Sequence, residues 1–287
     1  MNEVVVGVDG SPASGLALRW AYGLAQARRR PLRVIRTWQY PASAGAPGGP
    51  MTLPTPDEMD GAIQAELTGQ LADALGEDAG GVAAEVRRGS AAGVLVHRAV
   101  SLHADVVVVG ARGLGGFDRL LLGSTSRQCL EHAPCPVVIV RAPDADVSPG
   151  LPGRIVVGLD GSTAATRALS WAARLATDLG ADIVALHALG SRASEDVATR
   201  ARALLDGEWT DPLRTAGARY DTRLDARDPR IALLATAEEI DAGLIVTGTR
   251  GTGFVPGVLL GSVANHLAVR AHRPIAVVPA ASETDVH

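Results

Sequence analysis

Short apolar runs alternate with segments of helical periodicity along the first half of the chain. The run Val106–Val109 is apolar at every position, which is typical of a strand buried on both faces in a parallel sheet covered by helices. The segments between such runs have apolar residues at helical spacing, and one begins with Pro12 directly after Ser11, a good helix start. The pattern predicts strands at Glu3–Asp9, Leu32–Trp38, Ala83–Arg88, Asp105–Gly110 and Pro136–Arg141. It predicts helices at Pro12–Arg29, Asp57–Leu75, Ala91–Leu102 and Ser124–His132.

The second half of the chain repeats the first. The segment Val5–Ser11 recurs as Val156–Ser162, and a glycine-rich stretch after the fourth predicted strand recurs as well. A length of 287 residues, more than a single core usually holds, agrees with two domains. We therefore predict two copies of one α/β domain, at residues 1–143 and 152–282, joined by a linker at residues 144–151.

A segment rich in proline and glycine, Pro41–Pro56, has no counterpart in the second half. It explains most of the difference in length between the two copies. Its composition predicts a flexible loop, with a lid or an interface segment as the alternative.

Each copy places a carboxylate at the end of its first predicted strand, within a Gly-x-Asp-Gly-Ser sequence. The carboxylates are Asp9 and Asp160, and the serines that follow, Ser11 and Ser162, are better placed to cap the next helix. Parallel sheets bind ligands at the carboxyl ends of their strands, so an aspartate at this point either supports the helix start or faces a ligand. The pattern leaves both interpretations open.

The fourth predicted strand of each copy is followed by Gly-x2-Gly-x9-Gly-Ser, at Gly110–Ser124 and Gly248–Ser262. Glycines let backbone N–H groups approach phosphate oxygens, and a methyl group at Gly110 or Gly248 is expected to obstruct that approach. The final Gly-Ser opens a helix whose free N–H groups and dipole favour an anion, and the serine adds a hydroxyl. The alternative is a duplicated structural turn followed by an ordinary serine N-cap. Repetition of the motif after the same strand favours a phosphate site.

These motifs, together with the closing segment Ala133–Val140, resemble the universal stress protein family, in the bacterial form that carries two such domains in tandem. The resemblance covers nearly the whole chain. It implies two tandem Rossmann-like domains of the adenine nucleotide alpha hydrolase-like type, each an open parallel sheet of five strands in the order 3-2-1-4-5, flanked by helices. Members of the family that have the glycine motif bind ATP, so the resemblance implies ATP, with Mg²⁺, as the ligand.

The resemblance also assigns nucleotide contacts by position. Asp9 and Asp160 would approach the nucleotide, where a bound Mg²⁺ would relieve their repulsion from the phosphates. In the first copy the implied contacts are Asp9, Gly10, Thr37, Gly110, Arg112, Gly113, Gly123, Ser124 and Thr125. In the second copy they are Asp160, Gly161, Ala188, Gly248, Arg250, Gly251, Gly261, Ser262 and Val263. The main chain around Thr37 and Ala188 would meet the adenine edge, and the two arginines are equally well explained as solvated loop residues.

One pair of residues departs from the repeat near the implied site. After the third predicted strand the first copy has Gly89-Ser90, whereas the second copy has Arg227-Asp228. The bulkier and charged pair is expected to narrow or recharge the rim of the second site.

Composition excludes several classes of function. A net charge of -4 gives no indication of a general affinity for nucleic acid or for an anionic membrane. All 27 basic residues are arginine, which excludes chemistry that needs a lysine amine, including that of a Walker P-loop. Cys129 and Cys135 are expected to be buried small hydrophobes, and the 7 histidines share no position between the copies and no zinc-site spacing. Because no apolar stretch approaches the ~20 residues of a membrane span and no secretory signal is present, we expect a cytoplasmic protein.

Three hypotheses of function remain. The first is a nucleotide-binding regulator of a stress response or of dormancy, with little or no fast turnover and with a protein partner that the sequence does not identify. The second is a slow ATPase or another nucleotide-using enzyme on the same sheet. The third, a structural dimerisation module, leaves the glycine motif unexplained. The edges formed by the fifth strands favour a homodimer or an internal pseudo-dimer.

Overall fold

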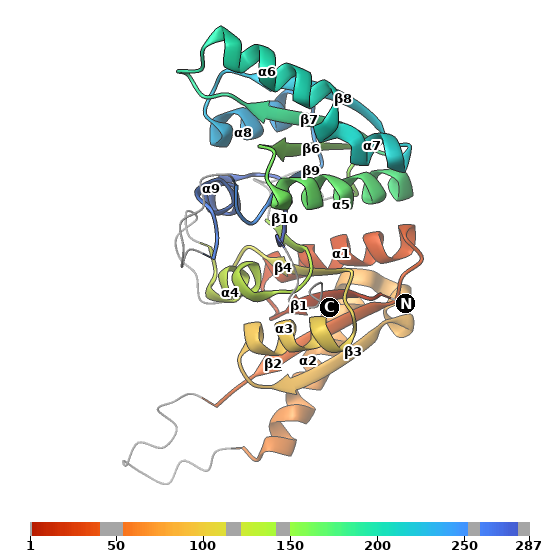
Figure 1. The fold of residues 1–287 in the computed structure, drawn as a ribbon. Coiled ribbons are helices and arrows are strands. Elements are labelled where there is room, and N and C mark those ends of the chain that lie inside the picture. The colour runs from red at the N-terminus through yellow and green to blue at the C-terminus, as the bar shows by residue number, and fades with distance from the viewer. Residues whose placement is uncertain (1, 41–53, 113–121, 142–149, 252–258, 281–287) are drawn as a thin grey trace, which may run out of the picture.

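The computed structural model describes residues 2–40, 54–112, 122–141, 150–251 and 259–280, and strands alternate with helices along them (Figure 1). The strands are β1 Val4–Val8, β2 Leu32–Trp38, β3 Ala83–Arg88, β4 Val106–Gly110, β5 Val137–Val140, β6 Arg154–Leu159, β7 Asp182–Ala188, β8 Arg219–Asp225, β9 Leu244–Gly248 and β10 Ile275–Val278. The α-helices are α1 Pro12–Ala27, α2 Pro56–Leu75, α3 Ala91–Ser101, α4 Ser124–His132, α5 Thr163–Leu179, α6 Glu195–Asp206, α7 Asp211–Ala216, α8 Pro229–Glu239 and α9 Ser262–Arg270. Two 3-10 helices are η2 Gly76–Gly81 and η3 Glu208–Thr210. The alternation confirms the predicted α/β class.

The strands of the two halves form one continuous sheet, in the order β3-β2-β1-β4-β5-β10-β9-β6-β7-β8. Each half has the predicted order 3-2-1-4-5 and is parallel throughout. The two five-stranded sheets are joined where β5 and β10 pair antiparallel, with Val138 opposite Ala276. This pairing makes the chain an internal pseudo-dimer through the fifth strands of the two halves, as the sequence predicted. A homodimer stays a prediction. Because β5 and β10 run in opposite directions, the carboxyl ends on the two sides of the junction lie at opposite edges of the sheet.

Helices cover both faces of this sheet and bury two apolar layers. On one face α1 and α5 contribute residues such as Leu24 and Leu175, which are completely buried. On the other face α3 and α9 contribute Leu95 and Leu267. Burial of each such side chain stabilises the fold by about 2 kcal/mol, so both layers hold the helices whose first turns border the predicted sites. None of the described helices has the length and apolar character needed to cross a membrane.

Arg28, directly after α1, connects the two halves by ionic contacts. Its Nη1 contacts the Oδ2 of Asp105, and its Nε donates to the Oδ2 of Asp178 in α5 at 2.7 Å. The Arg28 and Asp105 side chains are only 5% and 15% exposed, whereas that of Asp178 is 42% exposed. Arg28 and Asp105 have therefore lost most of their hydration and depend on each other for charge compensation. The contact with Asp178 is more hydrated and contributes less.

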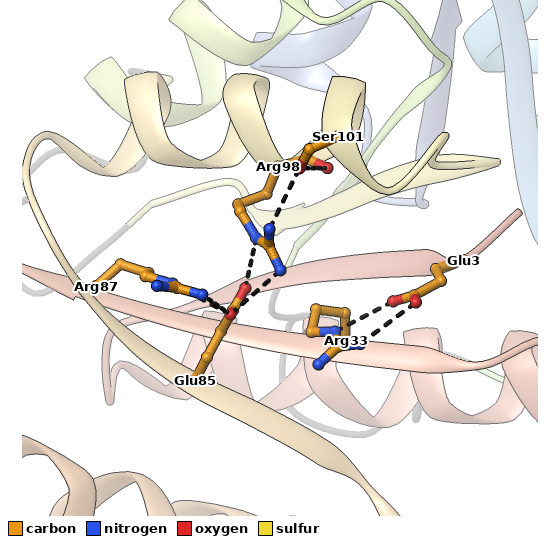
Figure 2. A network of polar contacts seen from close by, with 6 residues as sticks. All are labelled: Glu3, Arg33, Glu85, Arg87, Arg98 and Ser101. Atoms are coloured by element: carbon orange, nitrogen blue, oxygen red, sulfur yellow. Dashed lines mark hydrogen bonds and ion pairs between the residues drawn. The ribbon is translucent and has the colours of Figure 1, made fainter.

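A polar network crosses β1, β2 and β3 beneath α3 (Figure 2). Arg33 of β2 donates to both carboxylate oxygens of Glu3, at 3.1 and 3.3 Å. Glu85 of β3 accepts from Arg87 and, at 2.7 Å, from the Nε of Arg98 in α3. Burial raises the pKa of the Glu85 carboxyl, but the two guanidinium groups outweigh it and hold that pKa below its usual value. The network anchors α3 to the edge of the sheet.

Arg28→Met should destabilise the protein by on the order of 2–3 kcal/mol, because it leaves the Asp105 carboxylate without its cation in a largely dry setting. Asp178→Asn is the matched control, since it weakens only the more exposed contact and should cost less than about 1 kcal/mol. Denaturant unfolding measured for both variants checks this. Equal free energies of unfolding for the two variants would contradict the assignment of the buried contact as the important one.

Glu85→Gln should lower stability at neutral pH by about 1 kcal/mol and should have no effect in acid. The folded-state pKa of Glu85 lies below its unfolded value, so its stabilisation is present above the unfolded pKa and is lost as the pH falls through the folded pKa. The measurement is the free energy of unfolding of both proteins between about pH 3 and pH 7. A difference that stays constant over this range would show that the charge of Glu85 does not matter.

Candidate functional site

The ends of β1 and β6 form matching turns that hold the two predicted aspartates. The Oδ1 of Asp9 accepts from the backbone N–H of Ser11 at 3.0 Å, and the Oδ1 of Asp160 accepts from that of Ser162 at 3.0 Å. The serine hydroxyls cap α1 and α5, as predicted from the sequence. The aspartates are therefore held in place by their own turns and are not needed as helix caps.

The two halves support these turns with different side chains. Gly10 and Gly161 follow the aspartates with φ of +87° and +78°, a conformation that a side chain would strain. A Cβ added at Gly10 would lie 3.2 Å from the Nη1 of Arg36, whereas one at Gly161 would lie 2.8 Å from the ring of Trp209. His187 has in β7 the place of Arg36 in β2, and its ring packs edge-on against Trp209 with 4.9 Å between centroids. A guanidinium thus supports the first turn and an aromatic pair the second.

Gly110 and Gly248, the last residues of β4 and β9, lie against the first turns of α1 and α5. A Cβ at Gly110 would lie 2.9 Å from the backbone carbon of Ala13, and one at Gly248 would lie 2.8 Å from that of Ala164. The sequence-based expectation was that a methyl group here would obstruct a phosphate. The structure gives these glycines a different reason, since the methyl group would meet the helix that carries the aspartate turn.

The last glycine of each motif is a helix N-cap. Gly123 and Gly261 precede α4 and α9, and neither helix has a side-chain cap. The N–H of Gly123 donates to the Ala111 carbonyl at 2.9 Å, and that of Gly261 donates to the Thr249 carbonyl at 2.7 Å. The following residues, Ser124 and Ser262, are exposed first residues of their helices. The alternative of an ordinary serine N-cap therefore does not apply, and the first-turn N–H groups are available to an anion.

A cavity of about 340 Å³ lies at the carboxyl edge of the second half. It opens between the ends of β6, β7 and β9 and the first turns of α8 and α9. Eight of its lining residues are predicted contacts, namely Asp160, Ala188, Gly248, Arg250, Gly251, Gly261, Ser262 and Val263. Gly161 is the one predicted residue of the second half that is not among those lining it. The tertiary structure thus gathers residues from three strands and from the helices α5, α8 and α9 around one space.

Gly251 lies directly against the aspartate of this cavity. A Cβ added to it would collide with the Oδ2 of Asp160. Arg250 beside it points its Nε toward the Leu259 carbonyl at 3.4 Å. The start of the glycine stretch and the end of β6 therefore face the same ligand space.

Several lining residues of the second cavity were not predicted. Leu186 and Leu233, which were not predicted, form an apolar wall together with the predicted Val263. His187 was dismissed because the histidines share no position between copies, yet its Nδ1 lies 2.7 Å from the Leu159 carbonyl at the cavity. A carbonyl only accepts, so Nδ1 carries the proton in this contact. The signal available in the sequence was the position of His187 one residue before Ala188, at the end of a predicted ligand-facing strand.

The first half has a cavity of about 400 Å³ among its described residues, bordered by the end of β2 and the first turns of α3 and α4. The predicted contacts that line it are Thr37, Ser124 and Thr125. Asp9, Gly10, Gly110, Arg112 and Gly123 lie at the neighbouring ends of β1 and β4 and before α4. The Ser11 hydroxyl donates to the Oδ1 of Asp9 at 2.6 Å, and its oxygen lies 3.4 Å from the Arg112 carbonyl, so the aspartate turn lies next to the glycine stretch. Gly113 lies outside the described residues.

The residues that depart from the repeat after the third strand are placed differently in the two halves. Gly89 and Ser90 line the first cavity, whereas Arg227 and Asp228 are not among the residues lining the second. The guanidinium of Arg227 hydrogen-bonds Asp225 and holds the pKa of that carboxyl below its usual range. Asp228 caps α8 and hydrogen-bonds Arg230, which lowers its pKa as well. Both residues are engaged in contacts of their own, and the next residue, Pro229, lines the second cavity.

Two further predictions concern a metal ion at the aspartates and the burial of the two cysteines. Among the described parts of the chain no three His, Cys, Asp or Glu side chains are grouped as a metal site. A cation at Asp9 or Asp160 would therefore need further oxygen atoms supplied by a bound ligand. Burial raises the pKa of the Cys129 and Cys135 thiols to about 12, so both stay protonated and behave as small apolar side chains.

Comparison with known proteins places these features in a family. The sequence model of the universal stress protein family matches residues 1–141 and 152–279. A universal stress protein of Mycolicibacterium smegmatis is 36% identical over 292 residues, which cover 96% of both chains. One of Mycobacterium tuberculosis is 31% identical over 293 residues, covering 96% of this chain and 95% of its own. The crystal structure of a universal stress protein from Archaeoglobus fulgidus has a similar fold, with a TM-score of 0.68 and 22% identity over 96% of this chain and 98% of that one.

Alanine at Gly248 and at Gly251 should separate packing from ligand binding. Gly248→Ala drives a methyl group into the backbone of α5, so it should destabilise the fold by on the order of 1–3 kcal/mol. Gly251 is exposed and its methyl group would meet the Asp160 carboxylate, so Gly251→Ala should keep the free energy of unfolding within about 0.5 kcal/mol but weaken nucleotide binding. Thermal unfolding and ATP titration of both variants provide the measurement. A stable Gly248→Ala protein would disprove the packing role.

Proposed function

This chain belongs to the universal stress protein family, and from that membership and the geometry of its sites we propose that it is a nucleotide-dependent regulator that binds ATP with Mg²⁺. The observation that carries the proposal is the second cavity. There the uncapped first turn of α9 and the Ser262 hydroxyl face the same space as Asp160 and an apolar wall. An anionic group and an apolar ring are what these two parts would bind.

The parts of an ATP molecule match this arrangement. The phosphates fit the first-turn N–H groups of α9, because the helix dipole and the Ser262 hydroxyl favour negative charge there. The base fits the wall that includes Leu186 and Leu233, near the end of β7. The sugar would then lie along the end of β9. In the first half Ser124 and Thr125 of α4 and Thr37 of β2 border the corresponding space.

Asp160 explains why Mg²⁺ belongs in the proposal. Its carboxylate lines the cavity that would hold the phosphates, and two groups of like charge would repel each other there. A hard divalent cation bound to the phosphates and to a carboxylate oxygen removes this repulsion, since Mg²⁺ prefers oxygen ligands and commonly binds through one carboxylate plus phosphates. Asp9 has the same turn geometry in the first half and would act in the same way.

Binding without fast turnover fits the groups that line the second cavity. Asp160 and His187 could accept a proton among its described lining residues; the Oδ1 of Asp160 accepts a main-chain N–H, and His187 is held at the end of β7 through its Nδ1–H. The glycine motif Gly248–Ser262 contains no Asp, Glu or His, so no general base comes from the motif beside the proposed phosphate position, and this favours slow chemistry. We therefore place ATP in a regulatory role, with occupancy altering the surface offered to a protein partner in a stress response or in dormancy. A slow ATPase is the alternative.

The purified protein should carry adenine nucleotide and should bind two ATP molecules per chain in the presence of Mg²⁺. Mass spectrometry of nucleotide released by denaturation tests the first point, and equilibrium dialysis tests the second. Protein that is free of nucleotide and binds no ATP in dialysis would refute the proposal. ATP hydrolysis at rates near the ~10 s⁻¹ of a typical enzyme would replace it by the ATPase alternative.

Ser124→Asp and Ser262→Asp should each remove one of the two sites. A carboxylate at the first position of a helix is compatible with the helix dipole but repels phosphates bound at the same turn. Each variant should therefore bind one ATP where the unaltered chain binds two, with an unchanged melting temperature. Ser124→Asn and Ser262→Asn have the same shape without the charge and should retain both sites. Two ATP molecules bound to either aspartate variant would show that the phosphates lie elsewhere.

A further inference from the structure

Two threonines line the second cavity: Thr247, in β9, and Thr249, directly after that strand. They flank Gly248, whose missing side chain would point at Ala164 of α5. Side chains alternate across a strand, so both threonines point to the opposite face, toward α8 and α9. They are 8% and 7% exposed, which places their hydroxyls within the wall and not on the outer surface.

Both hydroxyls have hydrogen-bonding capacity that the protein does not use. The Thr247 Oγ1 donates to the Gly248 carbonyl at 3.4 Å, a long distance for such a bond. The Thr249 hydroxyl makes no hydrogen bond with any residue in the described ranges. A hydroxyl can donate once and accept twice, so both hydroxyls can bond to a ligand in the cavity. The wall beside them includes Leu186 and Leu233, so a ligand group that bonds to these hydroxyls is strongly distinguished from one that does not.

The position of Thr249 indicates which part of a nucleotide would meet it. Its carbonyl accepts from the N–H of Gly261 at 2.7 Å, so it lies directly beside the N-cap of α9, where the phosphates are proposed to bind. The next part of a nucleotide after the phosphates is the sugar. Thr247 lies about 7 Å deeper along the strand, between the sugar position and the apolar wall for the base. The group within reach is therefore the ribose with its two hydroxyls.

The first half has apolar residues at both corresponding places. Val109 and Ala111 flank Gly110 in the same way, and they are 3% and 4% exposed. We propose that Thr247 and Thr249 make the second site selective for ribose by hydrogen-bonding its hydroxyls, whereas the first site lacks this selection. The inference rests on the proposed function, because it takes the ligand of this cavity to be a nucleotide. The two sites of the chain then differ in which nucleotides they accept.

The test compares ATP with 2′-deoxy-ATP and 3′-deoxy-ATP by calorimetric titration in Mg²⁺ at one site at a time. Ser124→Asp leaves the second site alone, and Ser262→Asp leaves the first. The second site should bind ATP about 5- to 10-fold more tightly than at least one deoxy analogue, in excess of the ratio at the first site. Thr247→Val with Thr249→Ala should reduce that ratio to the value of the first site. Valine and alanine are the residues of the first half, so the fold should tolerate them.

Placing threonines at the corresponding positions of the first half gives a second, independent test in case the first variant is unstable. Val109→Thr with Ala111→Thr, on the Ser262→Asp protein, should raise the preference of the first site for ribose. Equal ratios at the two unaltered sites, or a ratio that the threonine exchange leaves unchanged, would overturn sugar selection. An equal loss for ATP and both analogues would also overturn it, because the hydroxyls would then bond the base or the phosphates. Absence of ATP binding at both sites would instead refute the proposed function itself.

Discussion

The candidate sites depend on one close contact between a helix and a strand. The first turns of α1 and α5 approach Gly110 and Gly248 so closely that a single methyl group would collide with helix backbone. A parallel sheet brings the carboxyl ends of its strands to one edge. The close contact of the helix with the fourth strand places the aspartate turn, at the end of the first strand, beside the glycine stretch at the end of the fourth. Without it, Asp160 and the first turn of α9 would not border one cavity.

The antiparallel pairing of β5 and β10 decides how the two copies relate. It makes each half cover the edge of the other, so neither fifth strand is left as an open template for pairing. The two halves have diverged in sequence at their candidate sites, as the exchange of Arg36 for His187 and of Val109 for Thr247 shows.

Prediction from sequence succeeded where a local pattern repeats and was incomplete where neighbours come from distant segments. The strands, the helix starts at Ser11 and Ser162, and the grouping of glycines near the aspartates follow from local rules and from the repeat. The packing role of Gly248 could not be predicted in this way, because it depends on how closely α5 packs against β9. His187 was missed for a related reason: comparison of the copies searched for identity, and its counterpart is an arginine paired with Glu66.

The sequence by itself determined the α/β class, the duplication and the edge of the sheet at which a ligand would bind, because hydrophobic period and glycine spacing act over a few residues. The tertiary structure decided that the two sheets join into one and that Asp160 faces Gly251. It also decided that Thr247 and Thr249 become cavity wall while Gly248 becomes a packing contact. These outcomes depend on distances between elements far apart in the chain, and packing against a whole neighbouring helix sets such distances.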